Sequence, residues 1–198
     1  MTTSAINEAM AARFLALTEG LKGESERGCV VLAIAWIEDD LTRILKRYLL
    51  PSTRTHESSD ELFGAQGYLG TFSAKIDIAY RLGLIRRPIH QCLHLCRRIR
   101  NDFAHLSDNL SFSTPSVNDR VAEIFRLNEG MIQQLWETSA QKHLPAEIRN
   151  EFHDLSGIQS LERLVGTRHL FEITAGTIVA GLTLALFELT PLQSLASE

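Results

Sequence analysis

The segment PIHQCLHLCRRIRNDFAH, residues 88–105, has the clear periodicity of an α-helix and contains the residues of the candidate functional site. Its apolar residues recur every three or four positions, which is the spacing of one face of an α-helix. Pro88 stands where a first-turn proline belongs, so we predict a helix from about residue 88 to residue 105. The predicted buried face consists of Ile89, Cys92, Leu93, Cys96, Ile99 and Phe103.

A neighbouring face of this helix carries a row of polar side chains, namely His90, His94, Arg97, Asn101 and His105. The simplest interpretation of His90 and His94 is a solvated polar face. Their spacing of four would also suit a metal ion, but the sequence shows no third ligand for it. The sequence therefore predicts no metal site, and no cofactor is expected.

Arg100 differs from the other polar residues, because a helical wheel places it inside the apolar face, between Cys96 and Phe103. A charged group on a buried face must be paired, or must face a cavity or an interface. In one interpretation the guanidinium binds a phosphate while His105 transfers a proton. In the other, Arg100 forms a structural ion pair with an acidic residue: Glu38, Asp39, Asp40 or Asp77.

The rest of the chain continues the helical periodicity, and no stretch shows the clean alternation of a half-buried strand. The predicted helices cover residues 5–22, 27–49, 72–82, 88–105, 119–136 and 160–187, with shorter pieces near 60–63 and within 142–158. We therefore predict an all-α fold, a single-domain helical bundle of about six to eight helices over residues 1–198. Its core would span 25–187, with an N-terminal helix in 1–24 and a tail in 188–198.

Local signals predict where several of these helices begin and end. Ser59 or Asp60 can cap the short piece, Thr71 the next helix, and Asn118 or Asp119 the helix that runs to residue 136. A glycine at position 83 followed by a leucine is typical of a helix C-terminus. The helix after Thr71 has a predicted apolar stripe of Phe72, Ile76, Ala79 and Tyr80.

Composition and charge narrow the class of protein. Hydrophobic residues make up 44% and charged residues 22% of the chain, as in soluble globular domains, and the net charge is -4. This charge excludes binding to duplex DNA through bulk positive charge. The three cysteines, Cys29, Cys92 and Cys96, lie in apolar helical patterns and predict reduced thiols in a cytoplasmic protein. A zinc site on Cys92 and Cys96 would need two more ligands.

Two apolar segments bear on membranes and partners. ITAGTIVAGLTLALF, residues 173–187, is shorter than the roughly 20 residues of a membrane span, so we predict a core helix and no membrane association. The N-terminus shows no signal peptide. CVVLAIAWI, residues 29–37, is apolar on every side, which places it in the middle of a bundle or in an oligomer interface. With the buried placement of Arg100, this favours a homodimer.

Two stretches in sequence resemble a known family. GYLGTFSAKIDIAYRLGLI at 67–85, followed by LHLCRRIRNDFAH at 93–105, resembles the MltR family of mannitol operon repressor-like proteins. The resemblance extends over roughly residues 25–187. It implies an all-helical domain with a role in transcriptional or stress regulation, without a helix-turn-helix, through a protein partner or through RNA or DNA. The residues that would bind such a ligand are His94, Arg97, Arg98 and Arg100.

RNDFAH, residues 100–105, is also similar to the Arg-Asn-x-x-x-His signature of HEPN domains. That resemblance implies a helical, usually dimeric protein, and many such proteins are metal-independent ribonucleases or toxins. Arg100, Asn101 and His105 would then be catalytic, with His105 activating a 2′-hydroxyl and Arg100 stabilising the charge on the phosphate. The sequence leaves three hypotheses open: a regulator, an endoribonuclease, and a helical scaffold in which Arg100 is structural.

Overall fold

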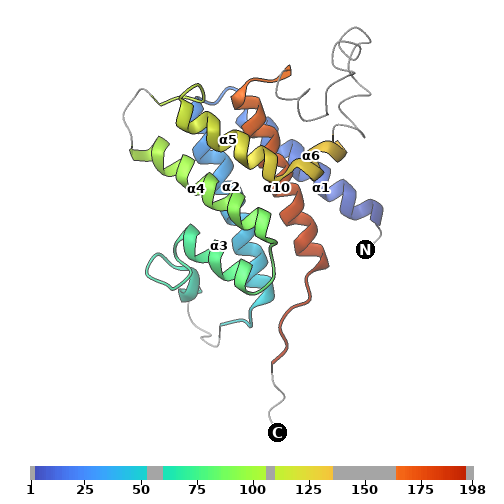
Figure 1. The fold of residues 1–198 in the computed structure, drawn as a ribbon. Helices are drawn as coiled ribbons and strands as arrows, with labels where there is room; N and C mark the ends of the chain where they lie inside the picture. Colours follow the sequence, from blue (N-terminus) through green and yellow to red (C-terminus); the bar gives the residue numbers. More distant parts are fainter. Residues whose placement is uncertain (1–2, 53–59, 106–109, 136–163, 195–198) are drawn as a thin grey trace.

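The computed structural model describes residues 3–52, 60–105, 110–135 and 164–194 (Figure 1). These residues form helices and no strand, so the predicted all-α class is confirmed. In chain order the elements are α1 (Thr3–Leu21), α2 (Glu26–Tyr48), the 3-10 helix η1 (Glu61–Phe63), α3 (Phe72–Arg81), α4 (Arg87–His105), α5 (Pro115–Leu127), α6 (Glu129–Leu135) and α10 (Thr167–Glu188). The predicted short piece within 142–158 lies outside the described residues.

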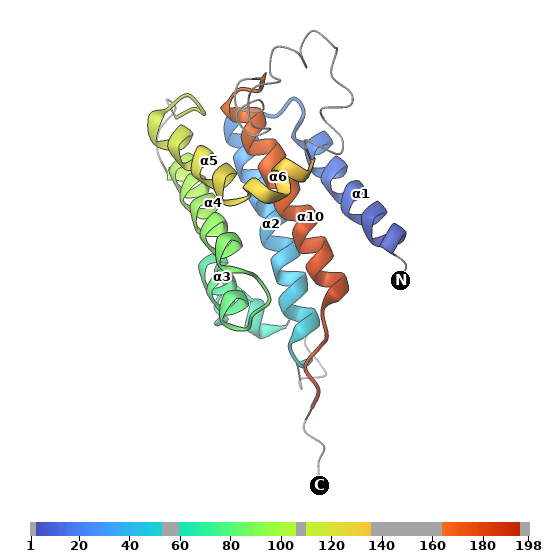
Figure 2. The same cartoon turned by 45° about the vertical axis from the view of Figure 1, so that its right-hand side comes forward.

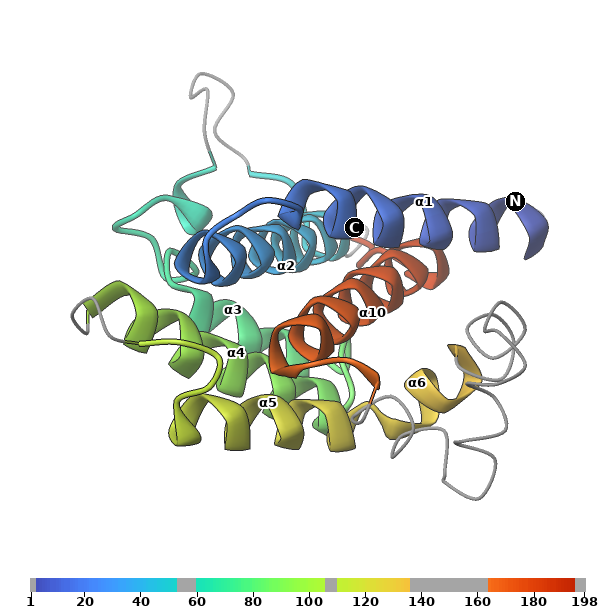
Figure 3. The same cartoon turned by 90° about the horizontal axis from the view of Figure 1, so that it is seen from above.

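Helix α2 is the centre of the bundle. It contacts α1, α3, α4 and α10, and α10 runs beside it along most of its length (Figure 2). Seen from above, α1 covers one side of the α2–α10 pair, and α4 with α5 covers the other (Figure 3). The apolar start of α2 is therefore inside the bundle on one side only, because Cys29, Val30, Ala33, Ile34 and Ile37 are buried whereas Val31 and Ala35 are exposed. The homodimer stays a prediction.

Polar side chains cap the start of several helices, and the caps at Asp60 and Thr71 are those that the sequence predicts. The side chain of Ser25 accepts a hydrogen bond from the backbone N–H of Gly28 at the start of α2. Asp60 caps η1 and Thr71 caps α3 in the same way. Each cap satisfies a backbone donor that the first turn of a helix leaves without a partner.

Three predicted helix boundaries are wrong. Pro115 starts α5 after Thr114, so Asn118 and Asp119 lie within the helix instead of capping it. The helix also breaks at Asn128, whose buried amide Nδ2 donates to the carbonyl oxygen of Ile124 at 2.8 Å, and a separate α6 follows. At the other end of the chain, α10 begins only at residue 167, because Gly166 before it is not helical.

By length and composition alone, helix α10 could cross a membrane. Half of its most apolar 18-residue stretch is buried inside the protein. It packs against α1, α2 and α5, which supports the prediction of a core helix. It approaches α1 closely at Gly176, where a Cβ atom would lie 2.7 Å from two ring carbons of Phe14. The small residue therefore allows the two helices to approach closely.

We predict that Gly176→Val lowers the free energy of unfolding by about 1–3 kcal/mol, because the added side chain overlaps the Phe14 ring. The matched control is Gly20→Ala in α1, where a Cβ meets nothing within 4 Å. Alanine is the better helix former, so the control should leave stability unchanged or raise it by up to roughly 1 kcal/mol. Urea unfolding followed by circular dichroism measures both. Equal stability of the two variants would contradict the close approach.

Candidate functional site

Helices α3 and α4 form an antiparallel hairpin whose tight turn positions the site. Gly83 adopts a left-handed backbone conformation with φ of 72°, as the sequence predicts for a helix C-terminus. The backbone N–H of Gly83 donates to the carbonyl of Tyr80 at 3.0 Å, and that of Leu84 donates to Ala79 at 2.9 Å. The turn brings the last turns of α3 beside the first turns of α4.

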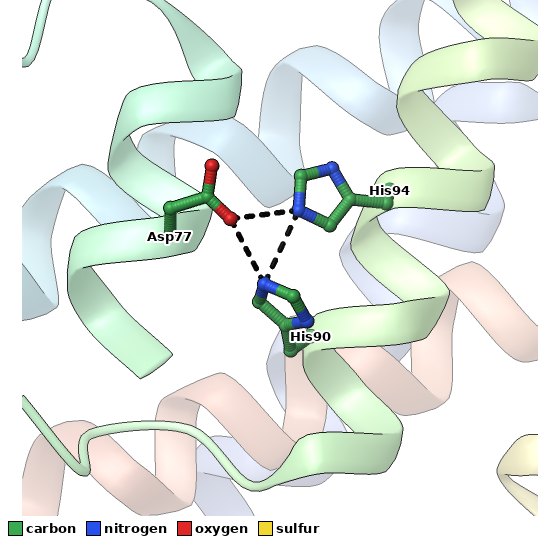
Figure 4. A group of neighbouring side chains, drawn as sticks. All are labelled: Asp77, His90 and His94. Atoms are coloured by element: carbon green, nitrogen blue, oxygen red, sulfur yellow. Dashed lines mark hydrogen bonds and ion pairs between the residues drawn. The ribbon is translucent and has the colours of Figure 1, made fainter. Parts of the chain in front are cut away.

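Asp77 of α3 points between His90 and His94 of α4, as Figure 4 shows. The Nε2 atoms of both histidines lie 2.9 Å from Oδ1 of Asp77. The two Nε2 atoms are 3.2 Å apart. Three polar atoms from two helices thus converge on one point. Asp77 thus supplies a third side chain with a metal-ligand atom beside the two histidines, which the sequence alone did not indicate.

The exposure of the histidines and of Tyr80 differs from what the sequence predicts. The histidine side chains are only 23% and 21% exposed, while Asp77 is 56% exposed, so the predicted solvated face holds only in part. Tyr80, predicted within the buried stripe of α3, is exposed, and its ring packs on His90 with the centroids 4.6 Å apart. Tyr80 therefore faces α4 and solvent, whereas Phe72, Ile76 and Ala79 of the same stripe are buried as predicted.

Hydrogen bonding within the cluster stabilises the charged carboxylate. The hydrogen bonds from His90, which has the larger effect, and from His94 lower the pKa of Asp77 below its ordinary value. Asp77 is consequently a carboxylate at neutral pH. The cluster presents one anionic oxygen and two imidazole nitrogens to the same point.

A second polar cluster lies further along α4 and includes Arg100. Its Nη1 donates to Oε2 of Glu38 in α2 at 3.0 Å, and the guanidinium lies 5.7 Å from the ring centroid of Phe72. The other oxygen of Glu38, Oε1, accepts from Lys75 of α3 at 2.8 Å. Among the four acidic residues that the sequence offered as partners for Arg100, Glu38 is the one that pairs with it.

The remaining predicted site residues occupy different environments. Arg98 is exposed, and Asn101 and Arg97 are half-buried. The Nε atom of Arg97 is buried and has no hydrogen-bond partner among the described residues. His105 ends α4, and its side chain lies outside the described part of the structure. The structure therefore holds Arg100 against α2, and the predicted catalytic combination of Arg100, Asn101 and His105 stays a prediction.

All three cysteines are buried free thiols, as the sequence predicts. Burial raises the pKa of Cys29 and of Cys92 to about 12, and it also raises the pKa of Cys96. Metal ions and electrophiles react with the thiolate, so these protonated thiols are poor ligands at neutral pH. In the residues that the structure describes, Asp77, His90 and His94 are the grouping of side chains suited to hold a metal.

Comparisons with known proteins give one structural likeness. No protein-family model and no curated protein sequence matches the chain. A chain in the X-ray structure of the MtlR–HPr complex from Escherichia coli superposes with a TM-score of 0.56 at 14% sequence identity. The match covers 87% of this chain and 99% of that chain. This likeness shows a shared MltR-like fold, as the resemblance at residues 67–105 implies, and it does not bear on the HEPN-like motif.

We predict that Glu38→Ala destabilises the protein more than Arg100→Ala does. Removing Glu38 leaves both Arg100 and the buried Lys75 without their carboxylate, whereas removing Arg100 leaves the Lys75–Glu38 pair. We expect losses of about 3 and about 1–2 kcal/mol in urea unfolding. The control Arg98→Ala, at an exposed position on the same helix, should stay within about 0.5 kcal/mol of the wild type. An Arg100→Ala variant as stable as Arg98→Ala would rule out the structural ion pair.

Proposed function

We propose that this chain is a regulatory protein that acts by binding a partner protein, with HPr as the candidate partner. The observation that carries the proposal is the shared fold with a chain whose structure was determined in complex with HPr. A role in transcriptional or stress regulation in the cytoplasm belongs to the same proposal. A protein that regulates through such binding needs an accessible surface and no catalytic group.

The surface that best fits a protein partner is the basic corner, which we define as the exposed residues Tyr80, Arg81, Arg86 and Arg87 around the α3–α4 turn. None of these three arginines makes an ion pair with another described residue. The chain as a whole carries a net charge of -4, so the corner is a local concentration of positive charge. Tyrosine and arginine are the side chains enriched at protein interfaces, and acidic groups on a partner would complement this corner.

A protein partner is favoured over nucleic acid by the state of the predicted binding residues. Arg100 is engaged by Glu38, His94 by Asp77, and Arg97 is half-buried. Of the four residues expected to bind nucleic acid, Arg98 is therefore the one whose side chain is exposed without a partner among the described residues. Within the set of residues predicted to bind nucleic acid, one exposed arginine is weak electrostatic support for binding a phosphate backbone.

We expect purified HPr to bind the wild-type chain saturably in isothermal titration calorimetry, with an affinity that falls as salt is raised. The double variant Arg86→Glu, Arg87→Glu should weaken binding by at least about 10-fold, since two charge reversals meet the partner's acidic groups. Arg126→Glu reverses an exposed arginine on α5 that is not part of the basic corner, and it should bind like the wild type. Absence of HPr binding together with saturable binding of RNA or duplex DNA would overturn the proposal.

The regulator proposal also predicts that the wild-type protein leaves single-stranded RNA intact in the presence of EDTA. Arg100 donates from Nη1 to Glu38, so binding a phosphate would compete with this ion pair. The assay includes His105→Ala and Arg100→Ala, each checked for folding. Cleavage that leaves cyclic phosphate ends, and that both substitutions abolish, would favour the HEPN-type ribonuclease instead.

A further inference from the structure

We propose that Asp77, His90 and His94 form a binding site for one divalent transition-metal ion of the zinc type. The inference is independent of the proposed function, because it rests on a cluster that a partner-binding role does not need. Both imidazoles and the carboxylate point to one place from two different helices, α3 and α4 (Figure 4). The helix spacing explains the arrangement of the histidines, since residues four apart lie one above the other on a helix face.

The distances between the three atoms are those of ligands around a small ion. Bonds of about 2.0–2.1 Å separate neighbouring ligand atoms by about 3.0 Å at right angles and by about 3.4 Å at tetrahedral angles. The Nε2 atoms lie 2.9 Å from Oδ1 of Asp77 and 3.2 Å from each other. A metal ion just above the plane of these three atoms would reach all of them with side-chain shifts of a few tenths of an ångström.

Hydrogen bonds alone do not account for the whole triangle. A neutral imidazole carries one N–H, so protons on the two Nε2 atoms satisfy at most two of the three contacts. The contact between the nitrogens of His90 and His94 then brings two donors together, or leaves a nitrogen lone pair facing the anionic carboxylate. A cation accepts a lone pair from all three atoms, and it requires no proton between them.

The ligand set indicates which metals fit. Two imidazoles and one carboxylate suit zinc, iron(II), cobalt, nickel and copper, whereas magnesium and calcium prefer oxygen ligands alone. No thiolate takes part, because all three cysteines are buried elsewhere in the core. Three protein ligands leave at least one coordination position open. The 56% exposure of Asp77 indicates that this position faces solvent, where a water molecule or a partner's side chain would complete the coordination.

Metal binding would fasten α3 to α4 at a second place beyond their connecting turn. Asp77 belongs to one helix and the histidines to the other, so an ion at this site bridges the two. A ligand that binds only the folded state raises stability in proportion to the logarithm of its concentration over its Kd. The proposal therefore predicts a metal-dependent rise in the thermal midpoint as well as direct binding.

The test uses the full chain freed of metal with EDTA and then dialysed, with zinc sulfate as the probe. We expect one zinc ion to bind per chain in calorimetry, and the thermal midpoint to rise by about 5–10 °C at a 100-fold excess over Kd. His90→Ala and Asp77→Asn should each weaken zinc binding by more than about 10-fold and abolish the shift. Asp77→Asn keeps the shape of an exposed side chain, so it remains informative if His90→Ala fails to fold. His169→Ala removes an exposed histidine of α10 and should bind zinc like the wild type.

Cobalt provides a spectroscopic check of the ligands. Cobalt bound by nitrogen and oxygen should give weak visible bands without the intense near-ultraviolet absorption that thiolate ligands produce, and the bands should disappear in Asp77→Asn. Two outcomes would overturn the proposal: zinc binding that persists unchanged in both variants, which would locate it elsewhere, and no zinc binding by folded wild-type protein, which would leave a cluster joined by hydrogen bonds only. Neither outcome bears on HPr binding, so this proposal and the proposed function can fail separately.

Discussion

The structure depends on pairing two carboxylates that the central helix α2 carries toward its neighbours. Glu38 and Asp40 are two residues apart, which places them on nearly opposite sides of the helix. Asp40 is buried and accepts two hydrogen bonds from Arg13 of α1, at 2.7 and 3.2 Å. Glu38 accepts from Lys75 of α3 and Arg100 of α4. Since an unpaired buried charge is costly, these pairs favour one placement of α1, α3 and α4 along α2.

The same pairing determines what α4 can offer as a site. Arg100 cannot bind Glu38 and a phosphate at once through the same Nη1 hydrogen atoms, so its structural role competes with a catalytic one. Three residues before it, Arg97 lies on the face shared with His90 and His94, and this face turns toward α3. The tight turn at Gly83 holds α3 beside α4, and this placement brings Asp77 within hydrogen-bond distance of His90 and His94. The cluster of Arg100, Glu38 and Lys75 is therefore satisfied by ion pairs within the protein. The cluster of Asp77, His90 and His94 remains partly exposed to solvent.

The sequence could predict features that depend on neighbours within one helix. The apolar faces of α2 and α4, the cap at Thr71 and the left-handed Gly83 all follow from local spacing. The need of Arg100 for a partner also followed from its position on the wheel, but the choice of Glu38 did not, because it depends on how α2 and α4 are aligned in space. Asp77 was considered only as a partner for Arg100. Its place beside two histidines depends on the packing of α3 on α4, which periodicity does not encode.

The packing of α1 has a consequence for synthesis on the ribosome. This helix packs mainly against α10, the last helix of the described chain, and less against its sequence neighbour α2. At about 5–20 residues per second, translation needs on the order of ten seconds to proceed from α1 to α10. During that interval Leu17 and Leu21, fully buried in the finished bundle, lack the surface that covers them. The apolar side of the nascent N-terminal helix therefore stays uncovered until the C-terminal helix emerges from the ribosome.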